Sequence, residues 1–191
     1  MPELEALFGV PQPARSHPEI DAGVHSLMAL EQAALLSPQP EVRFGALLHD
    51  VGKGTTSPGE WPRHKGHERR GVPLVEALCM RLGAPSPYRV VGMRAAGCHG
   101  LAHKAAELTA ETLLGLLEEW GPVADPAGIE QLIAIGWADK RGRTGFETVD
   151  YPAAEVLRRS RAAVAAEADR PRSSLHRRRL QALARLRAEQ R

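Results

Sequence analysis

The sequence predicts an all-α protein, and three observations support that prediction. Apolar residues recur at the spacing of amphipathic helices through most of the 191 residues. No stretch shows the strict alternation of a half-buried strand, and no internal repeat is present. Prolines and glycines separate the helical stretches from one another. We therefore expect a helical bundle, and the hydrophobic content of 43% suffices for a buried core.

The N-terminal region is expected to be an extended arm that leads into the first helix. Pro2, Pro11 and Pro13 punctuate residues 1–17. Asp21 is a suitable N-cap, because its carboxylate can accept hydrogen bonds from the first free amides of a helix. The predicted apolar stripe of this helix consists of Leu27, Leu30, Ala34 and Leu35. His25 is expected at the edge of this stripe.

The second helix should be central, because residues 41 to about 51 are apolar on nearly every side. His49 and Asp50 stand side by side at the end of its apolar run. Gly52 is expected to be the C-cap. Lys53 lies on the same side as the His-Asp pair if the helical turn continues.

The same spacing and the same breakers predict the remaining helices. They cover residues 64–82, 88–100, 109–120, 126–139 and 153–168, and a last helix follows Pro171. His99 is expected at a helix end, because two glycines bracket it and allow close backbone approach. Asp139 ends its own helix, where the helix dipole disfavours a carboxylate unless a metal ion, Lys140 or Arg141 compensates it.

Composition and cysteine usage indicate a cytoplasmic protein without membrane contact. No apolar run approaches the roughly 18–20 residues that span a bilayer. The N-terminus lacks the charged start and apolar core of a secretory signal. Cys79 and Cys98 have no CxxC partner, and free thiols fit a reducing compartment. Aromatic residues make up only 4% of the chain, which excludes a stacking platform for single-stranded nucleic acid.

The net charge of +2 conceals an asymmetry that divides the chain into two predicted domains, residues 1–150 and 151–191. The second has eleven arginines against four acidic residues, a net charge of +7, so the first carries −5. A basic helical C-terminal extension favours contact with a polyanion such as RNA. A solvated helix face is the alternative interpretation of the same arginines.

The adjacent His49 and Asp50 are the strongest chemical signal. Burying them costs about 2–7 kcal/mol for each unpaired group, and a metal ion would satisfy both. For an isolated pair, the alternative is an aspartate that orients a core histidine. Four other helices add candidates, and the full set of ligands is His25, His49, Asp50, His67, His99 and Asp139. Mixed imidazole and carboxylate ligands suit a hydrolytic divalent-metal site, whereas structural zinc would need short cysteine-rich spacings.

The order His…His-Asp…His…His…Asp and four longer phrases resemble a known superfamily. The phrases are HPEIDAGVHSLMALEQAA, PEVRFGALLHDVGKGTT, EWPRHKGHERRGVPLVEALCMRLGAP and ADKRGRTGFE. They resemble the HD superfamily of metal-dependent phosphohydrolases, an all-helical fold, and in particular the HD domain of bacterial CCA-adding enzymes. The resemblance implies 2′,3′-cyclic phosphodiesterase, 2′-nucleotidase and phosphatase activity on nucleotides or RNA ends.

The resemblance also implies metal ligands. Four residues match the ligands of the first metal ion in the superfamily, namely His25, His49, Asp50 and Asp139. Two further residues, His67 and His99, match the positions that hold a second ion in two-metal members. The cofactor is then one or two divalent ions among Ni, Mn, Co, Fe and Mg, with a metal-bound water as the nucleophile.

Other residues are implied to act on the substrate. Lys53 would stabilise charge on the phosphoryl group and would complete a catalytic set with His49 and Asp50. The candidate phosphate contacts are His64, Arg141 and Arg143.

The start of the chain departs from the CCA-adding enzymes. Their nucleotidyltransferase domain precedes the HD domain, whereas Met1 stands shortly before His25. We therefore expect a free-standing HD domain without CCA-adding activity.

Two alternative functions stay open. One is another HD-type nucleotide phosphohydrolase, either a nucleoside monophosphatase or a signal-nucleotide hydrolase. Gly52-Lys53 after the pair and the lack of a GYP motif argue against the guanosine-tetraphosphate and cyclic-di-GMP classes. The other is a non-catalytic RNA-binding module that uses the basic tail, although the presence of all six candidate ligands argues against it.

Overall fold

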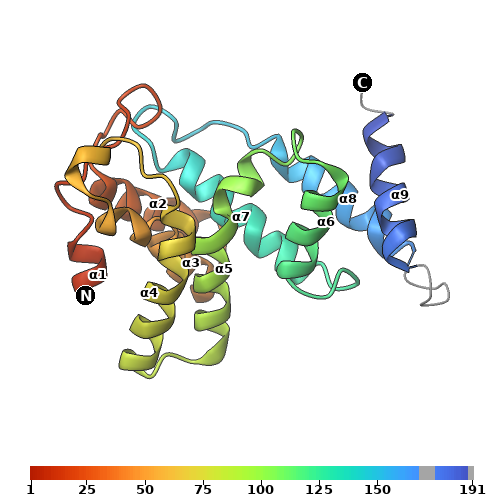
Figure 1. The fold of residues 1–191 in the computed structure, drawn as a ribbon, viewed down its shortest axis with the longest axis horizontal. Helices are drawn as coiled ribbons and strands as arrows, with labels where there is room; N and C mark the ends of the chain where they lie inside the picture. The colour runs from red at the N-terminus through yellow and green to blue at the C-terminus, as the bar shows by residue number, and fades with distance from the viewer. Residues whose placement is uncertain (168–174, 189–191) are drawn as a thin grey trace. The chain divides into compact units, whose positions relative to one another are not determined.

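The protein is all-α, as the sequence predicts. The computed structural model describes residues 1–167 and 175–188, and within them it contains no β-strand. The α-helices are α1 (Pro2–Glu5), α2 (Ala22–Leu36), α3 (Pro40–Leu48), α4 (His67–Leu82), α5 (Ser86–His103), α6 (Ala110–Glu119), α7 (Ala127–Arg141), α8 (Ala153–Ala165) and α9 (Leu175–Ala188) (Figure 1). Two 3-10 helices, η1 (Val51–Thr55) and η2 (Pro58–Glu60), lie between α3 and α4. In this part of the chain, no helix has the length and apolarity that crossing a membrane requires.

The chain forms two compact units, which we call the N-terminal unit and the C-terminal unit. The first consists of Met1–Gly100 and Ala134–Tyr151, and the second of Leu101–Ile133 and Pro152–Arg191. Helix α6 falls within the C-terminal unit, and the domain boundary expected at residue 150 stays a prediction. Helix α9 packs against α6 and α8 and buries Leu183 completely (Figure 1).

The N-terminal segment is not the extended arm that its prolines suggest. It begins with the short helix α1 and then packs Leu7 and Val10 against Ala22 in a small apolar cluster. An isolated β-bridge joins Pro11 to Asp21 and closes the segment over the start of α2. The prediction was wrong because apolar residues among the prolines are numerous enough to form a core contact of their own.

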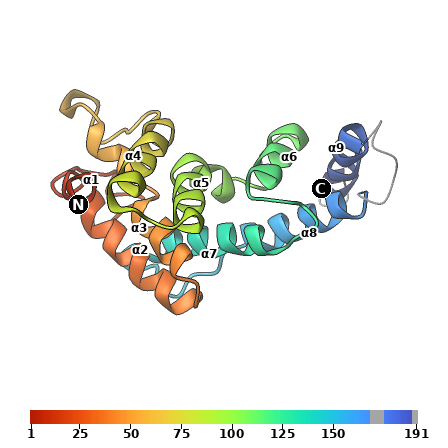
Figure 2. The same ribbon diagram turned by 90° about the horizontal axis from the view of Figure 1, so that it is seen from below.

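Helix α2 begins where the sequence predicts but buries a different face. The Asp21 carboxylate accepts hydrogen bonds from the first free amides of the helix, at Gly23 and Val24. The predicted stripe is wrong, since Leu27 is 42% and Leu35 is 80% exposed. The buried face instead consists mainly of small residues and includes Ala22, Gly23, His25, Ser26, Ala29 and Ala33. Small residues on this face leave room for close neighbours, since Gly23 lies under the ring of Phe8 and Gly142, after α7, passes close to Ala29. Helices α2 and α3 also pack against each other (Figure 2).

Helix α3 ends earlier than predicted, and Gly52 is not its C-cap. The last helical residue is Leu48, and after Asp50 the chain continues as η1. Gly52 lies inside η1, where a Cβ atom would be 2.0 Å from the carbonyl oxygen of His67. The glycine is therefore required by the contact between η1 and α4, which the sequence pattern of a single helix does not reveal.

The later helices follow the predicted pattern with shifted ends. Thr109 caps α6 through its side chain, and the apolar stripe of α7 is buried at Ile129, Leu132, Ile133 and Ile135. Helix α4 starts at His67 rather than His64. Helix α5 continues to His103, so His99 lies within a helix and not at its end.

The described part of the basic tail consists mainly of helices α8 and α9, and part of its charge is paired. Arg158 forms an ion pair with Glu130, and Arg179 forms one with Glu118. Arg159 and Arg177 are exposed. The expected break between these two helices at Pro171 lies outside the described residues.

Candidate metal centre

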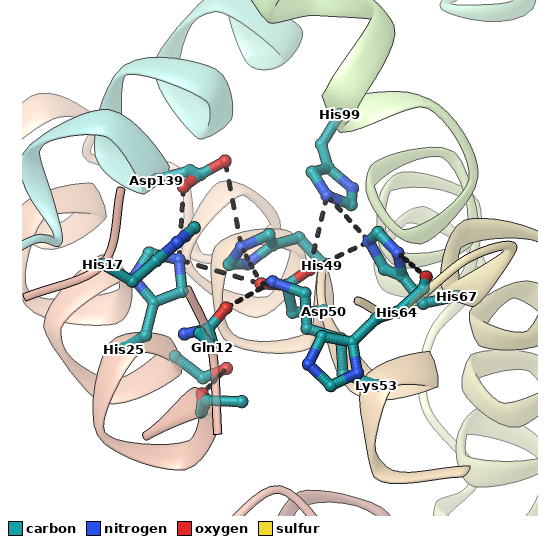
Figure 3. Close-up of polar contacts among 12 residues, drawn as sticks. Gln12, His17, His25, His49, Asp50, Lys53, His64, His67, His99 and Asp139 are labelled. Atoms are coloured by element: carbon teal, nitrogen blue, oxygen red, sulfur yellow. Dashed lines mark hydrogen bonds and ion pairs between the residues drawn. The ribbon is translucent and has the colours of Figure 1, made fainter. Parts of the chain in front are cut away.

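Six side chains that are far apart in the sequence converge inside the N-terminal unit. Five of them are at most 5% exposed, namely His25, His49, Asp50, His99 and Asp139. His67 is half-buried at the start of α4. The structure thus brings together all six candidate ligands that the sequence nominates, from α2, α4, α5, α7 and the two residues after α3 (Figure 3).

Asp50 is the centre of this cluster, and its two oxygens face different histidines. Oδ2 lies 3.2 Å from Nε2 of His49 and 3.8 Å from Nε2 of His25. Oδ1 lies 3.1 Å from Nε2 of His67 and 3.4 Å from Nε2 of His99. One carboxylate therefore stands between two pairs of imidazole nitrogens.

Each of the four histidines is oriented by a backbone carbonyl through its Nδ1 atom. The Nδ1–oxygen distances are 2.9 Å for His25 to Gly142, 2.6 Å for His49 to Ala46, 2.8 Å for His67 to His64 and 3.0 Å for His99 to Ala95. A carbonyl oxygen can only accept, so Nδ1 carries the proton and a neutral ring presents a bare Nε2 to the cluster. Metal-binding histidines are commonly held in this way.

This orientation argues against an aspartate that merely positions a core histidine. Such an aspartate would accept the Nδ1 proton of His49, but Ala46 takes that role and Asp50 faces Nε2 instead. The Nε2 atom of His49 is buried and has no hydrogen-bond partner. A metal ion would satisfy such a buried nitrogen beside a carboxylate.

Asp139 completes a second group of ligand atoms next to Asp50. Its Oδ1 lies 3.2 Å from Nε2 of His25, and its Oδ2 lies 4.0 Å from Nε2 of His49. Ligand atoms of His25, His49 and Asp139 all lie within 4.8 Å of one another, as do those of His49, Asp50 and His99. The donor set is rich in imidazole with two carboxylates, which suits a divalent transition metal.

The electrostatics of the cluster favour a cation. Burial disfavours a charged imidazole, yet Asp139 and Glu19 outweigh it and raise the pKa of His25 to about 9. A proton on Nε2, facing Asp139, therefore occupies the position that a metal ion would take, and metal binding would displace it. Burial also opposes ionisation of Asp50, but the Lys53 ammonium and the nearby His49 hold the pKa of Asp50 well below its usual range. The aspartate is therefore ionised and attracts positive charge to the centre.

Lys53 lies beside the cluster, as the sequence predicts, although it reaches there from a 3-10 turn. The residue is 7% exposed, and its Nζ donates hydrogen bonds to Oδ2 of Asp50 and Oε1 of Gln12. A fixed ammonium next to the ligand oxygens is well placed to stabilise a negatively charged group bound there.

The three predicted phosphate contacts lie in different surroundings. Arg143 donates to Oδ1 of Asp139 at 2.8 Å, while its buried Nε has no hydrogen-bond partner. Arg141 instead lies over the ring of Trp137 and donates to the carbonyl of Val149, and neither group belongs to the cluster.

His64 is anchored next to the cluster by the N-terminal segment. Its Nε2 donates to the carbonyl of Pro11 at 3.0 Å, and its buried Nδ1 has no partner. Burial lowers the pKa of His64, so the ring is neutral and Nδ1 is an acceptor. An acceptor suits a hydroxyl group better than a phosphate oxygen.

Sequence reasoning missed three residues of the N-terminal segment. Gln12 contacts Lys53, the His17 ring packs edge-on against His25, and a Glu19 carboxylate oxygen lies 3.2 Å from Nδ1 of His25. Burial and the nearby Arg143 lower the pKa of His17 to about 3, so that ring is neutral. The available signal was that Gln12 and His17 stand beside prolines, which fix the backbone.

Comparison with known proteins gives one family. The sequence model described as the HD domain matches residues 23–121, which is more than half of the 191 residues. That range contains five of the six converging ligands, and Asp139 lies beyond it. No solved structure matches this chain.

Proposed function

This chain belongs to the HD domain family of metal-dependent phosphohydrolases, and we propose that it hydrolyses 2′-phosphates and 2′,3′-cyclic phosphates of nucleotides or RNA ends. The observation that carries the proposal is the position of Asp50, between four inward-facing imidazole nitrogens and next to a buried lysine. Such a site needs a divalent cation and a negatively charged substrate to balance its groups.

The proposed cofactor is one or two divalent transition-metal ions. His25, His49 and Asp139 would hold an ion on the Oδ2 side of Asp50, and His67 and His99 would hold one on the Oδ1 side. Once bound, the metal supplies Lewis acidity and lowers the pKa of a coordinated water so that it can attack phosphorus. The carbonyl-bound Nδ1 atoms keep the histidines in the tautomer that this role requires.

Two residues, Lys53 and Arg143, are proposed to handle the charge of the phosphoryl group. Lys53 provides a positive charge that is held in place by Asp50 and therefore needs no reorganisation during the reaction. Arg143 is anchored on Asp139 and keeps its Nε donor for a phosphate oxygen.

Three observations support the proposed substrate class. The phrases that resemble the HD domain of CCA-adding enzymes include the loop after Lys53 and residues 139–147, which flank the cluster. Residues 1–150 carry a net charge of −5, so a triphosphate would meet more repulsion than a single phosphoryl group. The His64 Nδ1 acceptor also suits a neighbouring ribose hydroxyl.

The test is a side-by-side measurement of kcat/KM with Mn²⁺, Ni²⁺, Co²⁺ and Mg²⁺. The substrates are 2′-AMP, 2′,3′-cyclic AMP, 5′-AMP, dATP and a bis-(3′,5′) cyclic dinucleotide. We expect the two 2′-linked substrates to be preferred, Asp50→Ala to be inactive and the exposed Asp150→Ala control to match the wild type. If dATP or the dinucleotide is better by more than about tenfold, the proposed substrate class is wrong. If no phosphoester is cleaved with any of the metals, the proposed activity is wrong.

A further inference from the structure

A buried carboxamide beside the metal centre has one half of its hydrogen-bonding capacity unused. Gln12 is 2% exposed, and its Oε1 accepts a hydrogen bond from Nζ of Lys53 (Figure 3). An ammonium has only donors, so this contact fixes which end of the amide faces Lys53. The opposite end, Nε2, is buried and has no hydrogen-bond partner.

Backbone hydrogen bonds and prolines fix the position of the segment that carries Gln12. The backbone N–H of Gln12 donates to the carbonyl of Ile20, and that of Ala22 donates to Val10. Prolines on both sides of Gln12 restrict its backbone. The carbonyl of Pro11 is also tied to His64. The carboxamide is thus preorganised before any substrate arrives.

We propose that Gln12 is a substrate-contacting residue, whose Nε2 donates to a phosphoryl oxygen of the ester held at the metal centre while Oε1 keeps Lys53 in position. This inference rests on the proposed phosphoesterase function. An unpaired buried N–H is unfavourable, so a ligand that supplies an acceptor is favoured at this point. Nζ of Lys53 donates both to Oε1 of Gln12 and to Oδ2 of Asp50, so one ammonium links the carboxamide directly to the centre of the cluster.

The proposed role of Gln12 is a polar contact with the substrate and not only packing. Lys53 contributes charge, whereas Gln12 contributes a directed neutral donor, and the two are coupled through Oε1. Loss of Gln12 should therefore weaken the affinity for a phosphoryl group without weakening the affinity for the metal ion, because none of its atoms is among the proposed ligands.

The experiment uses the full chain and inorganic phosphate as the probe. Calorimetry measures Mn²⁺ binding to the metal-free protein and then phosphate binding to the Mn²⁺-loaded protein. Gln12→Met has similar length and removes both polar ends. Gln12→Glu keeps an acceptor for Lys53 but removes the donor, and it serves if the first variant does not fold. Gln181→Met makes the same change at an exposed position of α9 and is the matched control.

We expect Gln12→Met to bind Mn²⁺ within about twofold of the wild type and to bind phosphate about tenfold more weakly. Gln12→Glu should lose more phosphate affinity because its carboxylate repels the anion, and the control should change neither value. Unchanged phosphate binding in both Gln12 variants would show that the amide faces only an ordered water and would overturn the proposal. A parallel loss of Mn²⁺ binding would overturn it as well, because Gln12 would then act on the metal centre.

The calorimetric readout separates this inference from the proposed function. If the wild type cleaves no phosphoester but binds phosphate in a Gln12-dependent way, the inference stands and the proposed function fails. If the wild type cleaves 2′-linked substrates while Gln12→Met binds phosphate normally, the proposed function stands and the inference fails.

Discussion

Replacing Gly52 by alanine should disturb the metal centre through a backbone contact, without removing any candidate ligand side chain. A Cβ atom at this position would lie 2.0 Å from the carbonyl oxygen of His67 and 2.8 Å from the amide nitrogen of Gly71. Both atoms are backbone, so neither can rotate away. The 3-10 turn η1 and the start of α4 must move apart instead.

The size of the effect follows from these distances. Bringing the Cβ contact from 2.0 Å to 3.0 Å, below which real Cβ atoms are essentially never found, requires a relative shift of about 1 Å. Asp50 precedes η1 and contacts His67, which begins α4, at 3.1 Å. Metal–ligand distances tolerate only about 0.2 Å. We therefore expect a loss of about 1–3 kcal/mol in the free energy of unfolding, as in other overpacked sites, and weaker metal binding.

Urea unfolding of the metal-free protein measures the first effect, and calorimetry with Mn²⁺ measures the second. Gly59→Ala is the matched control, because a Cβ there meets nothing within 4 Å. That variant should stay within about 0.5 kcal/mol of the wild type. If Gly52→Ala unfolds at the wild-type midpoint and binds Mn²⁺ with wild-type affinity, the close contact between η1 and α4 is refuted.

Three further predictions address other parts of the chain. Gly115→Ala should stabilise α6 by about 0.5–1 kcal/mol in urea unfolding, since a Cβ there meets nothing within 4 Å; a destabilised variant would contradict this. Glu19→Gln should weaken metal affinity about 10- to 100-fold in competition with a chelator, because it removes the charge beside Nδ1 of His25; unchanged affinity would rule out that support. If the tail binds single-stranded RNA, each arginine that contacts a phosphate adds about 0.7 to the steepness with which log of the binding constant falls with log of the salt concentration. The double variant Arg159→Ala, Arg177→Ala should therefore make this slope shallower by about 1.4. An unchanged slope would show that both arginines belong to a solvated face.

Helix spacing predicted the fold well wherever burial depends on large apolar residues. The isoleucines and leucine of α7 are buried as expected, and Thr109 caps α6. The same reasoning failed for α2, whose buried face has Ala29 and Ala33 while Leu35 faces solvent. The backbone at Gly142, after α7, passes close to Ala29, and the pattern of a single helix cannot show which neighbour it will meet.

The six candidate ligands could be predicted because residue type, spacing and phrase-level resemblance all mark them. Gln12 could not, because its contact with Lys53 spans 41 positions and depends on the turn that returns the N-terminal segment to α2. Gly52 was misread for a related reason. A glycine before a loop is typical of a C-cap, but here the carbonyl oxygen of His67 occupies the space that a Cβ atom at residue 52 would need.

The central claim is that the cluster around Asp50 is a divalent metal centre, and equilibrium dialysis followed by elemental analysis tests it most directly. The full chain is stripped of metal, dialysed against Mn²⁺, Ni²⁺, Co²⁺ or Fe²⁺, and compared with Asp50→Ala and Asp150→Ala. We predict that the wild type and Asp150→Ala retain at least one ion per chain, whereas Asp50→Ala retains much less, because Asp50 contacts both imidazole pairs. A folded wild-type protein that retains none of these metals, or an Asp50→Ala variant that retains as much as the wild type, would contradict the claim.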